Sequence, residues 1–573
     1  MKINKLYIVI LLGILFSCTE DFLIINPPGA LSGEQLENKE GAEDQLIAAY
    51  AALANGGSGH TISSLWPYSS VHSDDAHKGG GGVGNRIEYD RLEQYYTIES
   101  DPGYDAVFGR LYTGVSRANS ALRTIKAIDE ADFPLKQNRM AEARFLRGHF
   151  FFTLKILFKY IPYFDETVRN DEILSISNRD LTNDELWDKI AEDFQFAADN
   201  LPLPANQPDQ GRTNQMAAKA YLAKVRLYQA YEQDENHNVV GINTQRLEQV
   251  VTLTDEVIAS NYDLNTDYAE NFLCGFENSQ ESVFEVQYSI NDGTDQGRLN
   301  MEHSLNYSMA PQYGCCWFHI PTQNLVNAFK TDANGVPMFD TFNNEEMKDP
   351  ADFLSNGVDP RLDHTVGIHG HPFKYQPDVL YDNSWERVPQ VYGSFGNMKE
   401  QQPAGSSCLR KVGAYFGSSM NVSIIRFADV LLWKAEALIE LGRQNEALPL
   451  INKVRERASN STGRLSYSDG TFASNYRISL YEDGVNIDWT KENARKALQW
   501  ERRLEFAMEN SRFFDLVRWG IAAETLNDYL DTERDRREFL SNAQFTKNKH
   551  EYLPISNNQI NYTNGVLIQN PNY

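Results

Sequence analysis

The amino-terminal half of the chain shows a helical spacing of apolar residues. From about Gly41, the apolar positions Leu46, Ala49, Tyr50 and Leu53 recur three and four residues apart, as one face of a helix requires. Further segments with this spacing run over about 104–127, 138–159, 183–200 and 212–232. The pattern therefore predicts a series of helices that each bury one face.

Two of these segments have the composition of closely packed helices. In AEARFLRGHFFFTLKILFKY, which ends before Pro162, two adjacent apolar stripes allow burial against neighbours on both sides. In AAKAYLAKVRLY, small residues such as Ala217 and Ala220 permit close approach, while Tyr221 and Tyr228 fill the gaps between helices. Helix pairs of this kind resemble tetratricopeptide units, although no regular repeat of about 34 residues is visible.

The pattern changes between about 261 and 421. Short β-type pieces such as ESVFEVQYS alternate with turns and with loops rich in Gly, Tyr, Trp, His and Asn. Long irregular segments are usually functional or disordered, and the aromatic content favours order. Helical spacing returns over about 424–441, 444–458 and 491–509. We expect a mainly α fold, with one domain over 37–573 whose helical scaffold comprises about 37–260 and 422–530.

The first residues indicate export and attachment to a membrane. Lys2 and Lys5 precede an apolar run that is too short for a membrane-spanning helix, so residues 1–17 are predicted to be a signal peptide. Leu15-Phe16-Ser17-Cys18 looks like a bacterial lipobox, which predicts lipidation of Cys18 and a tether over 18–36. The alternative is an ordinary signal with a chance cysteine.

Composition narrows the classes of partner. Acidic residues outnumber basic ones, 79 to 53, which gives a formal net charge of −26. A charge of this sign repels phosphate backbones, so nucleic acid is not expected as a partner. It also disfavours acidic polymers, because the sequence shows no basic run that would form a groove for them. Neutral ligands fit this composition better.

Four blocks and the carboxyl-terminal tail resemble the SusD/RagB family of Bacteroidetes surface lipoproteins. The blocks are AEARFLRGHFFFTLKILFKYIPYF, GRTNQMAAKAYLAKVRLY, IIRFADVLLWKAEALIELGRQNEALPLINKVRERA and ERRLEFAMENSRFFDLVRWG, and the tail is YLPISNNQINYTNGVLIQNPNY. Together with the lipobox they run in family order from end to end. Glu20 and Asp21, just after Cys18, resemble the acidic export signal of such surface lipoproteins.

The resemblance implies a tetratricopeptide-like scaffold on which the irregular region over 261–421 forms the ligand face. It implies a partner, a SusC-like TonB-dependent outer-membrane transporter, over which the protein closes as a lid on a captured oligosaccharide. It further implies binding rather than catalysis, no cofactor, and a place on the cell surface, anchored to the outer membrane by lipid.

The first candidate loop for such a ligand lies within residues 60–85. A sugar site needs flat aromatic rings with hydrogen-bonding groups around them. This loop gathers such side chains: Trp66, Tyr68, His72, Asp74, Asp75 and Lys78. Its Ser73-Asp74-Asp75-Ala76 segment looks like a recurrent loop of the family. The alternative is that Trp66 lies in the core and the acids are solvated.

The glycine run that follows, Gly79–Gly84, is expected to be a flexible surface loop. No Gly-Lys-Ser/Thr sequence follows it, so it does not indicate a phosphate-binding loop.

The second candidate loop covers 311–329. Its part from Trp317 onward resembles a Trp-x-x-x-Pro-Thr segment that borders the family's glycan site, which makes Trp317 the predicted stacking platform, with Tyr313 nearby. The alternative is that Trp317 is a core tryptophan. Cys315 and Cys316 are adjacent, and we hypothesise that they form a vicinal disulfide that contacts the sugar beside Trp317. Two reduced thiols, or separate bridges to Cys274 and Cys408, are the alternatives. The cysteine spacing does not match a zinc site.

The third candidate loop covers 365–418 and offers Trp385, Arg387, Tyr392, Lys411 and Tyr415. An arginine donates several fixed hydrogen bonds to ring hydroxyls, although a structural ion pair is the alternative for any single one.

Two further groups of chemically active residues have structural explanations. His72, Asp74 and His77 are metal-ligand types, but their spacing matches no recognised site, so no metal is expected. A dense charged cluster is expected to form ion pairs that fix helix packing; its members are Glu501, Arg502, Arg503, Glu505, Arg512, Asp515 and Arg518.

Two other functions remain as alternatives. A surface glycosidase needs two carboxylates across a sugar, but the alternating strand-helix pattern of a hydrolase barrel is missing. A peptide-binding lid of the same kind of transporter differs from the glycan-binding form only in its cargo.

Overall fold

The computed structural model describes residues 36–54, 56, 62–295 and 297–573. The predicted signal peptide, the predicted lipidation at Cys18 and most of the tether fall outside these residues. Among the helices of the described residues, none combines the length and the apolar character that crossing a membrane requires.

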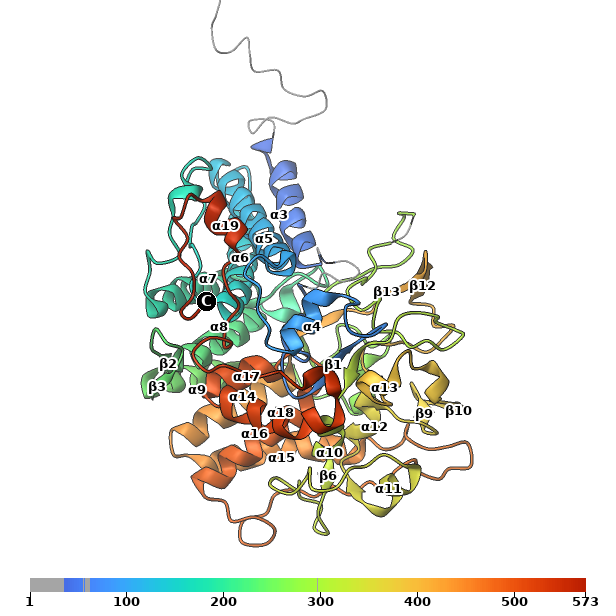
Figure 1. Cartoon of the computed structure of the whole chain (residues 1–573). Helices are drawn as coiled ribbons and strands as arrows, with labels where there is room; N and C mark the ends of the chain where they lie inside the picture. Colours follow the sequence, from blue (N-terminus) through green and yellow to red (C-terminus); the bar gives the residue numbers. More distant parts are fainter. Residues whose placement is uncertain (1–35, 55, 57–61, 296) are drawn as a thin grey trace, which may run out of the picture.

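The amino-terminal part is a series of helices, each packed against the next (Figure 1). The helices are α3 (Lys39–Leu53), α5 (Pro102–Ala127), α6 (Lys136–Phe158), α7 (Asn183–Asn200), α8 (Gln215–Ala230) and α9 (Thr244–Ile258). The short α4 (Ile87–Glu93) and the strands β2 (Tyr231–Gln233) and β3 (Val239–Ile242) lie between them in the chain. The helices predicted over 104–127, 138–159, 183–200 and 212–232 are confirmed to within a few residues.

Local sequence explains where these helices begin. The hydroxyl of Thr182 accepts a hydrogen bond from the N–H of Glu185, and the carboxylate of Glu185 accepts one from the N–H of Thr182, which is a capping box for α7. The carboxylate of Asp101 accepts from the N–H of Gly103 at 2.9 Å, and Pro102 occupies the first position of α5.

The carboxyl-terminal part returns to helices. They are α14 (Phe427–Glu440), α15 (Gln444–Asn460), α16 (Lys491–Phe506), α17 (Arg512–Trp519), α18 (Ala522–Arg536) and α19 (Asn557–Tyr562). Helix α14 packs against α8 and α9 and also against α15 and α16, so the two helical parts form one scaffold. The helices predicted over 424–441, 444–458 and 491–509 are confirmed, and α9, α17 and α18 add to them.

The segment between them is built from short strands and short helices, seen to the right of the scaffold in Figure 1. Its strands are β4 (Ser282–Val286), β5 (Phe318–Pro321), β6 (Lys330–Thr331), β7 (Gly357–Val358), β8 (Val366–Gly367), β9 (Pro372–Phe373), β10 (Gln376–Leu380), β11 (Gly396–Asn397), β12 (Leu409–Val412), β13 (Tyr415–Ser418) and β14 (Val422–Arg426). Its helices are α10 (Gln323–Ala328), α11 (Pro350–Ser355), α12 (Arg361–Thr365) and α13 (Pro389–Tyr392). Single turns of 3₁₀ helix lie at 173–175, 204–206, 268–272, 383–385 and 538–540.

Each described sheet has only two strands, and every pair is antiparallel. A two-stranded ladder is marginally stable alone, so this region depends on its contacts with the scaffold. The fold is mainly α, with the irregular region that the sequence pattern predicted.

The segment over 62–80 is not the exposed loop that its composition suggested. It includes β1 (Ala76–Gly79), and nearly all of its residues are buried. The carboxylate of Glu302 accepts hydrogen bonds from the backbone N–H groups of Ile62, Ser63 and Ser64 at 3.0 to 3.1 Å. A polar segment can therefore be buried here because its backbone groups find partners within the protein.

Helix α16 holds the irregular region through buried ion pairs. Its residues Glu501 and Glu505 both accept from the Nη1 of Arg361 in α12, at 2.6 and 3.1 Å. Glu505 also accepts from Arg426, at the end of β14, and from Arg457 in α15. All these side chains are buried. The ion pairs predicted for this charged cluster are therefore confirmed.

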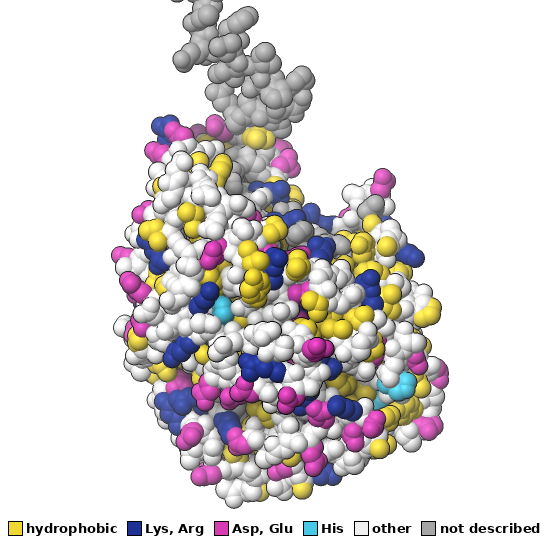
Figure 2. All heavy atoms as spheres, viewed as in Figure 1, with side chains coloured by type: hydrophobic (Ala, Val, Ile, Leu, Met, Phe, Trp, Pro, Cys, Tyr) yellow, Lys and Arg dark blue, Asp and Glu magenta, His cyan; other side chains and the backbone are white. Residues whose placement is uncertain are grey.

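Figure 2 shows acidic and basic side chains interspersed on the face that it presents. The net charge of −26 is therefore not concentrated as a single acidic field on that face.

We expect Glu505→Gln to lower the free energy of unfolding by about 3–5 kcal/mol, because three buried guanidinium groups would share one carboxylate fewer. Urea denaturation at pH 7 measures this. Glu446→Gln is the matched control, since the Glu446 carboxylate pairs with Arg443 at the surface, and it should leave the midpoint unchanged. Equal midpoints for the two variants would contradict the structural role of Glu505.

Candidate functional site

Two of the candidate loops lie side by side. In the β1–β5 pair Gly79 is opposite Phe318, and the N–H of Gly80 donates to the carbonyl of Trp317 at 2.7 Å. The glycine run is thereby placed beside the Cys315-Cys316 segment. A close approach of this kind requires glycine, because a Cβ on Gly79 would lie 2.4 Å from the Trp317 carbonyl oxygen.

The third candidate loop joins them. The N–H of Met309 donates to the carbonyl of Trp385 at 2.8 Å, and the guanidinium of Arg387 lies directly against Gly81. We call the place where the three meet, residues 80–85, 314–316 and 386–387, the three-loop surface. Segments selected separately in the sequence therefore form one face of the protein.

A disulfide joins Cys315 and Cys316 in this surface. The vicinal pairing that was hypothesised is thus confirmed, and the other two cysteines, Cys274 and Cys408, pair with each other. Cys316 is buried, whereas Cys315 is half-buried. One edge of the small sulfur-containing ring therefore reaches solvent.

The two tryptophans predicted to contact ligand belong to the core. Trp317 is 1% exposed, and its indole N–H donates to the carbonyl of Phe395 at 3.1 Å. Trp66 is fully buried, with its ring stacked on His319 at a centroid distance of 5.2 Å. A ring enclosed on both faces offers no stacking platform, so this prediction is wrong for both residues.

The remaining predicted aromatics support the surface from beneath. Tyr313 and Trp385 belong to a second apolar cluster together with Tyr307, Phe373, Tyr381 and Met398. Tyr68 and Tyr392 are buried in the main core, where they contact Tyr89 and Phe539 respectively. These rings are placed to hold the loops in shape, because a region with few regular elements needs large side chains to form a core.

The acidic pair of the first loop is also structural. Asp74 accepts from the Nε of Arg512 at 2.8 Å, and Asp75 accepts from the Nε of Arg503 at 3.0 Å. Burial alone would raise the pKa of Asp74, but the charges of Arg503 and Arg512 outweigh it and hold that pKa well below its usual range. These carboxylates therefore tie the first loop to α16 and α17 and do not face a ligand.

His72 and Lys78 are buried as well. His72 donates from Nδ1 to the carbonyl of Leu92 at 2.8 Å, and burial lowers the pKa of His72 to about 4. The ammonium of Lys78 pairs with Asp90 at 2.9 Å. Across the residues that the structure describes, no cluster of three or more His, Cys, Asp or Glu is arranged to hold a metal ion.

Arg387 lies in the three-loop surface and is exposed. Within the described residues its guanidinium makes no hydrogen bond or ion pair. The preceding Glu386 is buried, and neither of its carboxyl oxygens has a hydrogen-bond partner among those residues. Burial raises the pKa of Glu386 to about 8, against a smaller lowering by the Ser394 side chain, which favours the neutral carboxyl group.

Lys411 and Tyr415 lie on the β12–β13 hairpin of the third loop, and Phe416 of this hairpin packs against Tyr313 of the second apolar cluster. Lys411 is exposed and Tyr415 is half-buried.

A larger cleft adjoins the third loop and has a volume of about 800 Å³. Its lining combines Asn383, Pro389 and the 393–395 segment with Thr532, Asp535, Arg536 and Arg537 near the end of α18, together with Gln323, Glu346, Lys348 and Asp349. Volumes of 300–1,000 Å³ are typical of ligand sites. The α18 residues were missed because they have the charge pattern of any solvated helix end.

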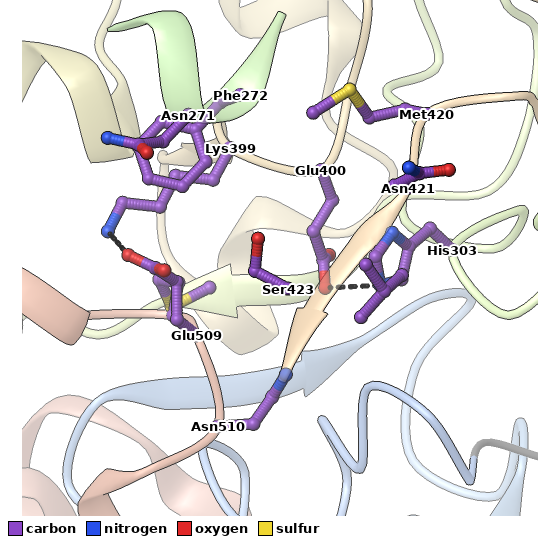
Figure 3. Close-up of a pocket in the computed structure, with 12 residues that line it drawn as sticks. Asn271, Phe272, His303, Lys399, Glu400, Met420, Asn421, Ser423, Glu509 and Asn510 are labelled. Atoms are coloured by element: carbon purple, nitrogen blue, oxygen red, sulfur yellow. Dashed lines mark hydrogen bonds and ion pairs between the residues drawn. The ribbon is translucent and has the colours of Figure 1, made fainter. Parts of the chain in front are cut away.

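A smaller pocket of about 70 Å³ lies where the irregular region meets the scaffold (Figure 3). Lys399 and Glu509 form an ion pair across one side at 2.6 Å, and His303 faces Glu400 on the other at 3.4 Å. A space of this size accommodates on the order of five water molecules. It is therefore suited to hydration of the buried polar groups and not to a sugar ring.

Comparison with known families gives two matches. Residues 280–573 match the model of the SusD family, and residues 45–227 match a family described as starch-binding associating with outer membrane. A SusD-like protein from Formosa agariphila is 24% identical over 556 residues, which span 92% of this chain and 93% of that protein. Another from Bacteroides ovatus is 25% identical over 538 residues, spanning 90% and 82%.

Solved structures share the fold. A SusD homolog from Bacteroides thetaiotaomicron matches with a TM-score of 0.71 and 19% identity, covering 95% of this chain and 99% of that chain. Surface glycan-binding protein A from the same organism, in complex with laminarihexaose, matches with a TM-score of 0.63 and 20% identity, covering 93% and 99%.

We expect mass spectrometry of the unreduced protein to find Cys315 and Cys316 joined within one peptide, and Cys274 linked to Cys408. Alkylation without reduction should leave all four unmodified, because only free thiolates react. The same digest after reduction, with all four cysteines alkylated, is the control. Modification of both Cys315 and Cys316 before reduction would contradict the vicinal disulfide.

Proposed function

A family model that matches more than half of the chain shows that this protein belongs to the SusD family, and from that premise we propose that it captures glycans at the cell surface. It then delivers oligosaccharides to a partner SusC-like TonB-dependent transporter of the outer membrane and acts as the lid of that transporter. In this proposal the protein binds its cargo and does not cleave it.

The observation that carries the proposal is the meeting of three separate loops at one surface. A rigid base of buried aromatics lies beneath it, and other residues of the third loop line a cleft of about 800 Å³. Binding sites are commonly built this way, from loops positioned by a rigid scaffold. The match to a family described as starch-binding and the likeness to a protein solved with laminarihexaose support a glycan as the cargo.

The three-loop surface has suitable chemistry for a sugar. The Cys315–Cys316 ring presents a small apolar edge to one face of a pyranose, and the Arg387 guanidinium can donate to ring hydroxyls. The half-buried Cys315 and exposed Arg387 therefore take the role that was first assigned to Trp317.

The anchor and the partner complete the proposal. Lipidation of Cys18 would hold the protein at the outer membrane, and Glu20 and Asp21 would direct it to the outer face. The irregular loops would then face the transporter channel together with the captured glycan.

We expect calorimetric titration of a soluble Cys18→Ala form to detect binding of one class of oligosaccharide. A reducing-end assay of the same mixtures should show no cleavage. Replacing both Cys315 and Cys316 by alanine should weaken that binding by roughly tenfold, since about 1.4 kcal/mol of contact would be lost. The matched control replaces Cys274 and Cys408, the other disulfide, by alanine and should retain binding.

Several outcomes would overturn parts of this proposal. Equal binding by the two double variants would place the glycan away from the vicinal disulfide. Release of new reducing ends would show that the protein cleaves glycans and is an enzyme. Binding of peptides, with no binding of any oligosaccharide tested, would identify peptides as the cargo. Thermal unfolding of each variant establishes that the comparison is made on folded protein.

A further inference from the structure

We propose that the glycan bound at the three-loop surface carries an anionic group, a uronate carboxylate or a sulfate ester, which pairs with Arg387. This inference rests on the proposed function and names the class of sugar that the surface selects.

The first observation is an unpaired guanidinium in an acidic protein. Acidic residues outnumber basic ones by 79 to 53, and surface arginines such as Arg169 and Arg443 are paired with a nearby carboxylate. Arg387 is exposed and makes no hydrogen bond or ion pair with any residue in the described part of the chain. Its five N–H donors are thus available to a ligand.

The second observation is that this guanidinium lies against the backbone of the glycine run. A Cβ on Gly81 would lie 3.0 Å from Cζ of Arg387 and 3.1 Å from its Nη2, so the absence of a side chain at Gly81 lets the guanidinium rest on the backbone. The N–H of Gly81 donates to the side chain of Asn85 at 2.8 Å, which fixes the loop itself. A side chain that is already positioned loses less conformational entropy when it binds.

The third observation is that the neighbouring charges compensate one another. Lys78 pairs with Asp90, and Arg86 lies 3.5 Å from Glu88. Farther along the third loop, Asp382 is an exposed carboxylate that accepts from the N–H of Ser384 at 2.8 Å and forms no ion pair with Arg387 in the described part of the chain.

Glu386, which adjoins Arg387 in sequence, is buried without a hydrogen-bond partner among the described residues, a setting that favours its neutral form. The charge of Arg387 is therefore not cancelled by its immediate neighbour.

A guanidinium in this setting favours a carboxylate or sulfate over a hydroxyl. Its planar fork donates two parallel hydrogen bonds to such an anion, and charge-assisted bonds are roughly twice as strong as neutral ones. A local pairing of this kind allows a protein with a net charge of −26 to bind an acidic polysaccharide without a wide basic groove.

The test compares oligosaccharides that differ only in charge. Trigalacturonate and its methyl ester share one skeleton, and a sulfated galactose oligosaccharide with its desulfated form provides the second pair. Calorimetry on the soluble Cys18→Ala protein should show at least one anionic member binding roughly tenfold more tightly than its neutral counterpart. The anionic oligosaccharide that binds identifies carboxylate or sulfate as the group that is recognised. Higher salt should weaken the binding of this anionic oligosaccharide more than that of its neutral counterpart.

Variants then assign the preference to Arg387. Arg387→Gln should bring the ratio of anionic to neutral affinity close to one, and Arg387→Lys should retain part of it because the charge remains without the fork. Gly81→Ala should lower the ratio of anionic to neutral affinity, because the added methyl group would displace the Arg387 guanidinium. Arg169→Gln is the matched control: it removes one exposed positive charge from the scaffold and should leave the ratio unchanged.

The outcomes separate this inference from the proposed function. Neutral oligosaccharides that bind as tightly as every anionic counterpart would overturn the anionic preference while leaving glycan capture intact. A preference that survives in Arg387→Gln would also overturn the inference. Failure of every glycan to bind would overturn both.

Discussion

The buried ion pairs on α16 are the interaction on which the rest of the structure depends. Glu501 and Glu505 lie four residues apart, on one face of the helix, and both accept hydrogen bonds from Arg361 of the irregular region. Arg503 of the same helix pairs with Asp75 of the first loop. One helix of the scaffold therefore holds two segments that have little regular structure of their own. Removing one partner of such a pair leaves a buried charge uncompensated, so the arrangement tolerates little change.

This anchoring explains how irregular loops can form an ordered surface. Two-stranded ladders cannot hold the region alone, so aromatic side chains and buried ion pairs take over that task. The side chains used for this purpose are then unavailable to a ligand. What remains at the surface is a small set: the edge of the vicinal disulfide, the backbone of the glycine run and the guanidinium of Arg387.

The candidate site was therefore predicted well as a set of segments and poorly as a set of side chains. Trp66, Trp317 and Asp74 are residue types that bind sugars, and each lies in a loop that borders the surface. Each is buried, because in a region of loops the large rings and paired acids form the core. Arg387 was identified because an arginine in an irregular loop can donate several hydrogen bonds to ring hydroxyls. No sequence signal marked Gly81 as the residue on which it rests.

The sequence by itself determined the features that depend on neighbours in the chain. Apolar spacing located the helices of the scaffold, because a helix repeats every 3.6 residues, and adjacency alone made Cys315 and Cys316 candidates for a disulfide. Only the tertiary structure decided which loop residues face solvent. Asp74 and Arg512 are separated by 438 positions, and Gly81 and Arg387 are similarly remote in sequence, yet both pairs are in contact. Such contacts are set by how the scaffold packs, and no local pattern encodes them.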